Sequence, residues 1–410
     1  MDSALRNYLV VTGGYWAFTI TDGAIRMLVV LYFHQIGYSP LEIALLFLFY
    51  EFFGVVTNLV GGWLGARIGL NKTMHIGMAL QVVALTMLTV PDSYLSVAYV
   101  MFAQALSGIA KDLNKMSAKA SVKLMLPQDD EQKDSRLFKW VAVLTGSKNS
   151  LKGAGFFIGG ALLSWVGFRM ALAILAGSLL GLLIVTFVLL PQEIGKIKGK
   201  AKFSQVFSNT PAINWLSAAR FFLFGSRDVW FVVGLPVFLA SSLGWAHSEV
   251  GGFLALWIIG YGVVQASAPR LLQRSHHHRG PDGSTSRGWV FSLALFPAAI
   301  ALALQQSYDP TLVLIVGLAL FGIVFAINSA IHSYLILAYS EHAKVSMNVG
   351  FYYMANAGGR LVGTILSGWA YQTLGLIGCL WISTGFFILA GLLSFGLPGT
   401  KDSSSRQSVQ

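Results

Sequence analysis

Long apolar stretches alternate with short polar loops along the whole chain. A helix that crosses a bilayer needs roughly 20 mostly apolar residues. Segments that meet this requirement lie near residues 8–34, 41–64, 73–90, 94–113, 138–165, 168–190, 212–240, 248–270, 289–305, 311–338, 346–371 and 375–397. The pattern predicts an all-α polytopic membrane protein with about twelve transmembrane helices.

Loops rich in Lys and Arg alternate along the chain with loops that contain almost none. One alternate set contains nearly all of the loop Lys and Arg residues, namely Arg67, Lys72, Lys115, Lys119, Lys123, Lys133, Arg136, Lys139, Lys196, Lys198, Lys200, Lys202, Arg270, Arg274, Arg279, Arg287 and Lys344. The opposite set has almost none apart from Arg169. Because basic loops stay on the cytoplasmic side, we expect a multi-pass protein of the bacterial inner (plasma) membrane with both termini in the cytoplasm.

Composition supports this picture and excludes other classes. Apolar residues make up 55% of the chain and charged residues 11%, whereas about a quarter of a typical soluble domain is charged. The net charge of +11 lies mainly in loops, so it does not indicate nucleic-acid binding. The sole cysteine, Cys379, excludes an internal disulfide and a thiolate metal site. We therefore expect no metal and no cofactor.

The two halves of the sequence resemble each other. "GYSPLEI" at 37–43 resembles "GWAHSEV" at 244–250. Further matched pairs are Phe18 with Phe224, Asp22 with Asp228, Gly155 with Gly359, Gly159 with Gly363, and Trp165 with Trp369. The offset is about 204 to 207 residues throughout, which indicates a parallel repeat of two six-helix halves.

This repeat predicts the domain organisation. We expect an N-terminal six-helix bundle at 1–190 and a cytoplasmic linker at 191–210. A C-terminal six-helix bundle follows at 211–398, and a disordered cytoplasmic tail at 399–410.

Twelve spans, a parallel repeat and a basic central loop resemble the major facilitator superfamily. That superfamily carries G-x-x-x-D-R-x-G-R/K-R/K between its second and third helices. The segment "GWLGARIGLNK" at 62–72 keeps Gly62, Arg67, Gly69 and Lys72, but has Ala66 where the family usually has aspartate. The resemblance implies a gating loop here with an altered charge relay.

Several ionisable residues fall inside the predicted spans. Such residues usually face an aqueous path or pair with one another. The predicted substrate-binding residues are Arg26, Lys148, Lys152, Arg227, Asn356 and Arg360, and the predicted proton-coupling residues are Asp22, Glu51 and Asp228. Cations outnumber anions among them, which favours an anionic substrate with phosphate or arsenate oxygens.

Structural interpretations remain open for some of these residues. Asp22 and Arg26 are four apart on one helix and can form a structural pair. Glu51 fits a proton carrier or a helix-packing hydrogen bond equally well. Arg220 is expected to snorkel toward the cytoplasmic end of its helix. Lys111, Asp112 and Lys115 suit a gate or a solvated helix end.

The amino-terminal region narrows the family further. "TDGAIRM" at 21–27, "GYSP" at 37–40 and "YEFFGVVTNLVGGWLGAR" at 50–67 resemble the organoarsenical efflux permeases, the ArsJ branch of the superfamily. The resemblance implies export of 1-arseno-3-phosphoglycerate, and hence arsenate resistance. It also implies functional pairing with a glyceraldehyde-3-phosphate dehydrogenase that makes this ester from arsenate and glyceraldehyde 3-phosphate.

The predicted function is therefore an alternating-access exporter of an organic anion, coupled to protons. The alternatives are a permease for another phosphorylated or carboxylated organic anion, in either direction, and a membrane sensor that does not transport. An enzyme is not expected, because the intramembrane residues contain no nucleophile–base pair and no metal cluster with convincing spacing.

Overall fold

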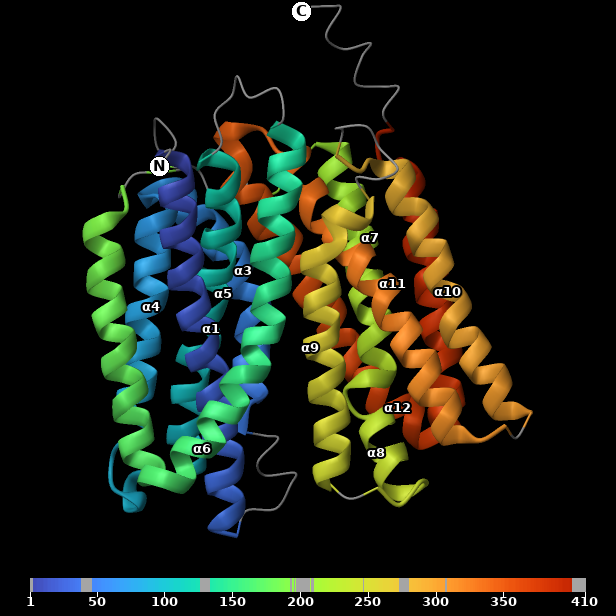
Figure 1. The fold of residues 1–410 in the computed structure, drawn as a ribbon, viewed down its shortest axis with the longest axis horizontal. Coiled ribbons are helices and arrows are strands. Elements are labelled where there is room, and N and C mark those ends of the chain that lie inside the picture. Colours follow the sequence, from blue (N-terminus) through green and yellow to red (C-terminus); the bar gives the residue numbers. More distant parts are fainter. Residues whose placement is uncertain are drawn as a thin grey trace, which may run out of the picture. The chain divides into compact units, whose positions relative to one another are not determined.

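The described part of the chain is helical throughout in the computed structural model (Figure 1). The structure describes residues 3–37, 46–125, 133–191, 194, 196, 207, 210–245, 247–272, 280–306 and 308–399. Several sequence features therefore lie outside it: most of the predicted linker, the tail from 400, the histidines at 276–278 and most of "GYSPLEI".

Within the described residues, every predicted span overlaps a helix. The helices are α1 (Ser3–Gln35), α3 (Leu48–Ile68), α4 (Leu70–Met87), α5 (Val97–Met125), α6 (Lys133–Leu189), α7 (Pro211–Phe231), α8 (Gly234–Ser241), α9 (His247–Leu272), α10 (Gly283–Gln305), α11 (Pro310–Ala338) and α12 (Val345–Leu393), with short 3₁₀ turns at Asp92–Tyr94 (η1), His342–Lys344 (η3) and Ser394–Gly396 (η4). The predicted span at 212–240 is divided into α7 and α8. The all-α prediction is confirmed.

Two of these helices are long enough to cross a bilayer twice. α6 contains non-helical backbone at Gly167, with φ 77°, and α12 contains it at Gly375, with φ 66°. Glycine accepts positive φ without a steric penalty, so the chain reverses direction there. Gly167 falls between two predicted spans, and Gly375 is the first residue of the last predicted span. In the described residues, seven segments have the length and hydropathy of membrane spans, and two of these are the α6 and α12 regions.

The helix starts follow ordinary capping chemistry. Thr210 accepts a hydrogen bond from the Ile213 backbone N–H and precedes Pro211, which opens α7. Asp282 and Asp309 accept in the same way at the starts of α10 and α11. These caps satisfy backbone donors that a helix leaves unpaired at its first turn.

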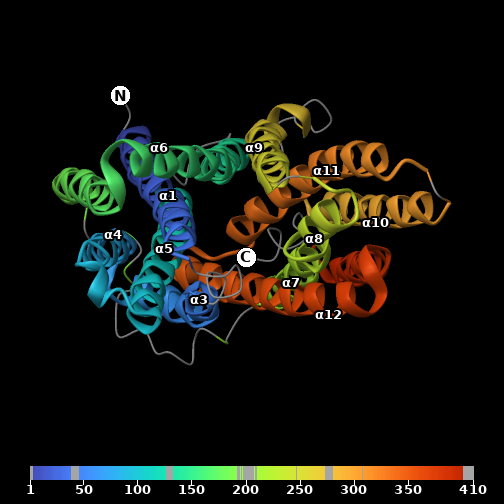
Figure 2. The same ribbon diagram turned by 90° about the horizontal axis from the view of Figure 1, so that it is seen from below.

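The chain forms two compact units. Unit 1 comprises Met1–Lys133, Ser147–Ser208 and Glu341–Met354, and unit 2 comprises Asp134–Gly146, Asn209–Ser340 and Ala355–Gln410. Figure 2 shows α1, α3, α4 and α5 side by side in unit 1, and α7 to α11 side by side in unit 2. Each unit therefore includes a short segment from the other half of the sequence.

Each unit has its own apolar core. In unit 1 it includes Ile25 and Leu28 of α1, Met78 of α4 and Phe168 of α6. In unit 2 an aromatic cluster includes Trp230, Phe321, Phe325 and Phe387. Many large apolar side chains instead lie on the surface, such as Trp165, which is 80% exposed. Lipid tails are the solvent that suits such a surface.

Glycines allow the same close helix crossing in both units. A Cβ at Gly155 would lie 2.5 Å from the Ile20 carbonyl oxygen of α1, and one at Gly159 would lie 2.6 Å from that of Ala24. In unit 2 a Cβ at Gly359 would meet the Phe221 carbonyl oxygen of α7, and one at Gly363 would lie 2.5 Å from that of Gly225. These are the glycines that the sequence repeat matches, so the repeat preserves a packing contact.

Candidate functional site

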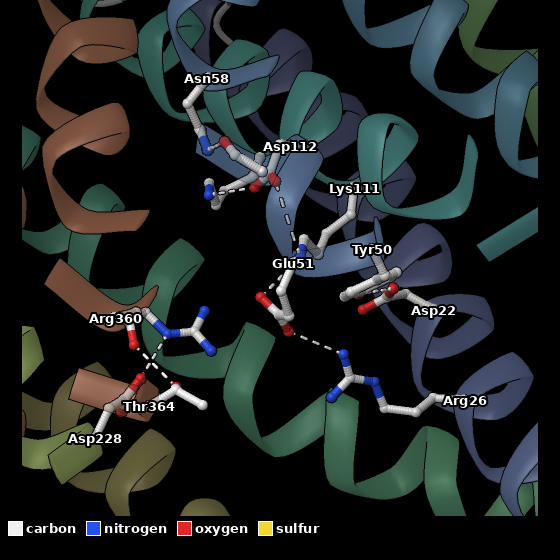
Figure 3. A network of polar contacts seen from close by, with 12 residues as sticks. Asp22, Arg26, Tyr50, Glu51, Asn58, Lys111, Asp112, Asp228, Arg360 and Thr364 are labelled. Atoms are coloured by element: carbon white, nitrogen blue, oxygen red, sulfur yellow. Dashed lines mark hydrogen bonds and ion pairs between the residues drawn. The ribbon is translucent and has the colours of Figure 1, made fainter. Parts of the chain in front are cut away.

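Charged side chains gather inside each unit. The unit 1 charge group consists of Asp22 and Arg26 from α1, Glu51 from α3, Lys111, Asp112 and Lys115 from α5, and Lys148 and Lys152 from α6. The unit 2 charge group consists of Arg220, Arg227 and Asp228 from α7, with Arg360 from α12. Figure 3 shows part of each group.

Asp22 of α1 is a buried carboxylate. It accepts a hydrogen bond from the Tyr50 hydroxyl at 2.5 Å, and Lys152 Nζ lies 3.5 Å from its Oδ2. The expected pair between Asp22 and Arg26 is wrong. Although both lie on one face of α1, the long Arg26 side chain reaches Glu51 of α3 at 3.0 Å.

The sequence offers Lys152 no obvious partner within its own helix. The structure instead pairs it with Asp22 across the α1–α6 contact. Lys148 lies one turn before it and is half-buried. Within the described residues, no carboxylate lies within 4.0 Å of the Lys148 ammonium.

Glu51 connects α1 to α5. Its Oε1 pairs with Arg26, and its Oε2 lies 4.0 Å from Lys111 Nζ. Lys111 also lies 3.8 Å from the centre of the Tyr50 ring, and the Arg26 guanidinium lies 4.6 Å from it. The Glu51–Lys111 contact could not be predicted from the sequence, because the two residues are far apart along the chain.

Lys111, Asp112 and Lys115 do not lie at a helix end, because α5 continues to Met125. Asp112 is buried and pairs with Lys115 at 2.5 Å and with Lys111 at 3.9 Å. Further along α5, Lys119 donates to the Tyr353 hydroxyl at 2.5 Å. The gate interpretation therefore remains for this segment.

In unit 2, one aspartate holds two arginines. Asp228 is fully buried, and it accepts hydrogen bonds from Arg227 and, at 3.0 Å, from Arg360 Nε. Arg227 also lies against the ring of Phe224, 5.2 Å from its centre. Like Lys152, Arg360 takes its carboxylate partner from another helix.

Arg220 does not snorkel. Arg220 is only 3% exposed, and its Nε donates a hydrogen bond to Asn356 Oδ1 at 2.8 Å. Its guanidinium also lies 3.7 Å from the centre of the Phe224 ring. Asn356, a predicted substrate-binding residue, thus contacts a buried arginine. The burial of Arg220 could not be predicted from its position along the helix.

The predicted gating loop joins α3 to α4. Gly69 has φ 104°, a conformation that favours glycine, and it separates the two helices. Gly62 lies against the start of α12, where Ser346 Oγ donates to its carbonyl oxygen at 2.7 Å. Arg67 stacks on Trp63 at 5.1 Å, and Lys72 is half-buried in the first turn of α4. Ala66 packs on Met347 at the position where an aspartate was expected.

Arg169, the basic residue of the loops that otherwise contain almost no Lys or Arg, forms an ion pair outside the spans. Arg169 pairs with Asp92 at 2.9 Å, and Tyr32 donates to the same carboxylate oxygen at 2.7 Å. The hydrogen bond from Tyr32, followed by the one from Arg169, lowers the pKa of Asp92 below its ordinary value.

Both groups contain more cations than carboxylates. Five cations accompany three carboxylates in the unit 1 group, and three arginines accompany Asp228 in the unit 2 group. In a low-dielectric interior this surplus favours an anion with several oxygens. Among the described residues, no group of three His, Cys, Asp or Glu side chains could hold a metal ion.

Sequence comparison identifies one family. The model described as Major Facilitator Superfamily matches residues 11–282 and 216–410, which together include most of the chain. No curated protein matches the sequence significantly.

Solved structures with the same fold cover nearly all of the chain. The human organic anion transporter MFSD10 (TETRAN) has a TM-score of 0.75 at 15% identity, with 96% of this chain and 100% of that chain covered. A bacterial homologue of the iron transporter ferroportin, in its outward-facing state, has a TM-score of 0.74 at 16% identity, with coverages of 95% and 98%. The proton:xylose symporter XylE has a TM-score of 0.73 at 14% identity, with 96% of each chain covered.

Proposed function

Because the chain belongs to the major facilitator superfamily of membrane transporters, we propose that it exports an organic anion, 1-arseno-3-phosphoglycerate, by alternating access coupled to protons. The family indicates a multi-pass transporter of a small molecule rather than an enzyme. The observation that carries the choice of an anion is the cation surplus in both charge groups.

The proposed substrate has an anionic group at each end. Within unit 1, Arg26, Lys148 and Lys152 are the proposed cations for such a group. Within unit 2 they are Arg227 and Arg360, with Asn356 orienting Arg220. Guanidinium groups suit phosphate and arsenate oxygens because they donate two parallel hydrogen bonds. Cys379 is buried and lies outside both charge groups, so neither charge group offers a thiolate for trivalent arsenic. The organic anion transporter with the same fold supports an anionic substrate.

Protons are coupled through the three carboxylates that hold these cations. A proton on Asp22, Glu51 or Asp228 removes the charge that pairs with Lys152, Arg26 or Arg360. The released cation then has a higher affinity for the anionic substrate, which couples proton binding to substrate binding. Two proton symporters share the fold, which supports coupling of this kind.

The cellular setting follows from the same proposal. The protein lies in the bacterial inner membrane with both termini in the cytoplasm, as the basic loops indicate. A companion glyceraldehyde-3-phosphate dehydrogenase supplies the ester in the cytoplasm. Export then confers arsenate resistance.

Uptake into inverted membrane vesicles tests this function. With an imposed proton gradient, vesicles that contain the protein are expected to accumulate the ester generated in situ by a dehydrogenase of this type. Control vesicles without the protein are not expected to do so. Free arsenate and 3-phosphoglycerate serve as competing substrates. Accumulation of 3-phosphoglycerate alone would identify a permease for another phosphorylated anion, and no accumulation of any anion would contradict the proposal.

A further inference from the structure

The carboxylate of Glu51 lies between two cations from different helices. Arg26 of α1 contacts its Oε1 at 3.0 Å, and Lys111 of α5 lies 4.0 Å from its Oε2. Figure 3 shows the Glu51 carboxylate directed at both side chains. A single carboxylate thus bridges two positive groups.

Glu51 is the accessible carboxylate of the unit 1 charge group. Its side chain is 41% exposed, and that of Arg26 is 27% exposed. The side chains of Asp22 and Asp112 are only 4% and 3% exposed. The Arg26–Glu51 pair is therefore the more exposed part of the group, whereas the other two carboxylates are enclosed by their partners.

Both cations are positioned without the help of Glu51. The Tyr50 ring lies 4.6 Å from the Arg26 guanidinium and 3.8 Å from the Lys111 ammonium. Tyr50 is itself buried and is fixed by its hydrogen bond to Asp22. Cation–ring contacts and the Lys111–Asp112 pair keep the two cations near each other if Glu51 leaves.

We propose that Arg26 and Lys111 form an oxyanion subsite that Glu51 occupies in the substrate-free protein. An oxyanion of the substrate binds by displacing the Glu51 carboxylate, which then takes one proton from solution. This inference rests on the proposed function and deepens it, because it adds Lys111 to the substrate contacts and gives Glu51 a defined role. One proton is bound for each oxyanion that enters.

The displacement follows from the chemistry of the two groups. Carboxylate and phosphate-like oxygens use the same charge-assisted hydrogen bonds to guanidinium and ammonium groups. They cannot occupy one position together, and a displaced carboxylate beside a bound anion is disfavoured in its charged form. Protonation removes that repulsion.

The surrounding charges support a proton change at Glu51. Arg26 and Asp22 face it from α1, Lys111 and Asp112 from α5, and Lys152 from α6. The titratable residues of α4 are Lys72 and His75, which lie in its first two turns, at the opposite end of α3 from Glu51. Three cations and two carboxylates therefore surround Glu51, and a bound dianion would shift this balance toward negative charge.

Binding of radiolabelled sulfate to the purified full-length protein tests the subsite. Sulfate is tetrahedral and keeps both charges across the range used, so any proton linkage belongs to the protein. Between about pH 6 and 8, wild-type affinity is expected to fall about tenfold per pH unit, as the uptake of one proton requires. Glu51→Gln is expected to bind sulfate about tenfold more tightly at the upper end and with little pH dependence.

Three further variants sharpen the test. Glu51→Asp keeps a carboxylate and is expected to keep the pH dependence. Adding Lys111→Met to Glu51→Gln is expected to remove the gain in affinity. Asp92→Asn removes a carboxylate outside both charge groups and is expected to match wild type.

The outcomes separate this subsite from the proposed function. Unchanged or weaker sulfate binding in Glu51→Gln, a wild-type pH dependence in that variant, or no sulfate binding by any variant would overturn the subsite. If Glu51→Gln gains affinity but vesicles do not accumulate the arsenate ester, the subsite stands and the substrate is wrong. If vesicles accumulate the ester without that gain, the transport function stands and the subsite is wrong.

Discussion

At the scale of single residues, two buried carboxylates are held by partners on another helix. Asp22 pairs with Lys152, and Asp228 pairs with Arg360. Removing a partner from such a pair leaves a charge that the interior does not solvate. These pairs can therefore serve two purposes, since the cations that hold the helices together are also the groups that an anionic substrate requires.

The variants Lys152→Ala and Arg360→Ala test the proposed substrate-binding cations. Each is expected to lower the initial rate of transport at low substrate at least about tenfold, because a charge-assisted contact is lost. Arsenate resistance of cells that carry each variant gives the readout, with membrane levels of the protein measured in parallel. Arg287→Ala is the matched control, since Arg287 stacks on Phe395 and belongs to neither charge group. Full resistance in both the Lys152 and the Arg360 variant would contradict the proposed binding roles.

At the scale of helices, close contacts through glycine fix how α6 lies on α1 and how α12 lies on α7. The contacts bring backbone against backbone, so a methyl group has no room. At the other end of unit 1, Asp92 connects α1 to α6 through Tyr32 and Arg169. Glycine contacts and a polar contact thus restrain the same pair of helices.

Replacing the contact glycines is expected to destabilise both units. Gly155→Ala and Gly359→Ala should each cost about 1–3 kcal/mol, because the added carbon displaces a neighbouring carbonyl group. Thermal unfolding in detergent measures the loss as a lower Tm. Gly177→Ala and Gly368→Ala are the controls, since nothing lies within 4 Å of an added Cβ at either position. An equal Tm in the contact and control variants would show that the crossings are looser than described.

The Tyr32–Asp92–Arg169 contact is expected to depend on pH in one direction. The pKa of Asp92 is lowered in the folded protein by its hydrogen bonds to Tyr32 and Arg169. A depressed carboxyl pKa contributes stability that is full above the ordinary value of about 4 and is lost as the pH falls through the lower folded value. The Tm difference between wild type and Asp92→Asn should therefore stay constant from about pH 7 to 5 and disappear only below about pH 4. A difference that already shrinks between pH 7 and 5 would contradict this assignment.

At the scale of the whole molecule, loops rich in Lys and Arg alternate along the chain with loops that contain almost none. The basic loops predict the direction of insertion, because Lys and Arg are not readily translocated. The exposed apolar side chains of each unit require lipid around them. Membrane insertion and orientation are therefore properties of the whole chain.

Cysteine labelling in intact cells tests the orientation. Native Cys379 is fully buried, so the wild-type protein should not react with a membrane-impermeant maleimide. Tyr94→Cys lies in a loop without basic residues and should label from outside, whereas Glu341→Cys should label only after the cells are opened. Labelling of Glu341→Cys in intact cells would reverse the proposed orientation.

The sequence by itself determined the helices and the glycines that the repeat matches, and it predicts the direction of the loops. Apolar length locates a span without knowledge of its neighbours, and Gly167 and Gly375 mark the turns because only glycine accepts their backbone conformation readily. The repeat also identified the glycines at the crossings, since close approach demands the smallest residue in both units. The surplus of buried positive charge was likewise visible, because composition does not depend on pairing.

Only the tertiary structure decided which charges meet. Helical spacing placed Asp22 and Arg26 on one face, yet Asp22 contacts Lys152 and Arg26 contacts Glu51. The contact of Lys111 with Glu51 and the burial of Arg220 likewise depend on packing between helices. The period of one helix tells which residues share its face, but a partner on another helix depends on how far each helix is rotated and how closely it packs. Packing of the whole bundle sets that rotation, so the choice between these ion pairs lies beyond any local pattern.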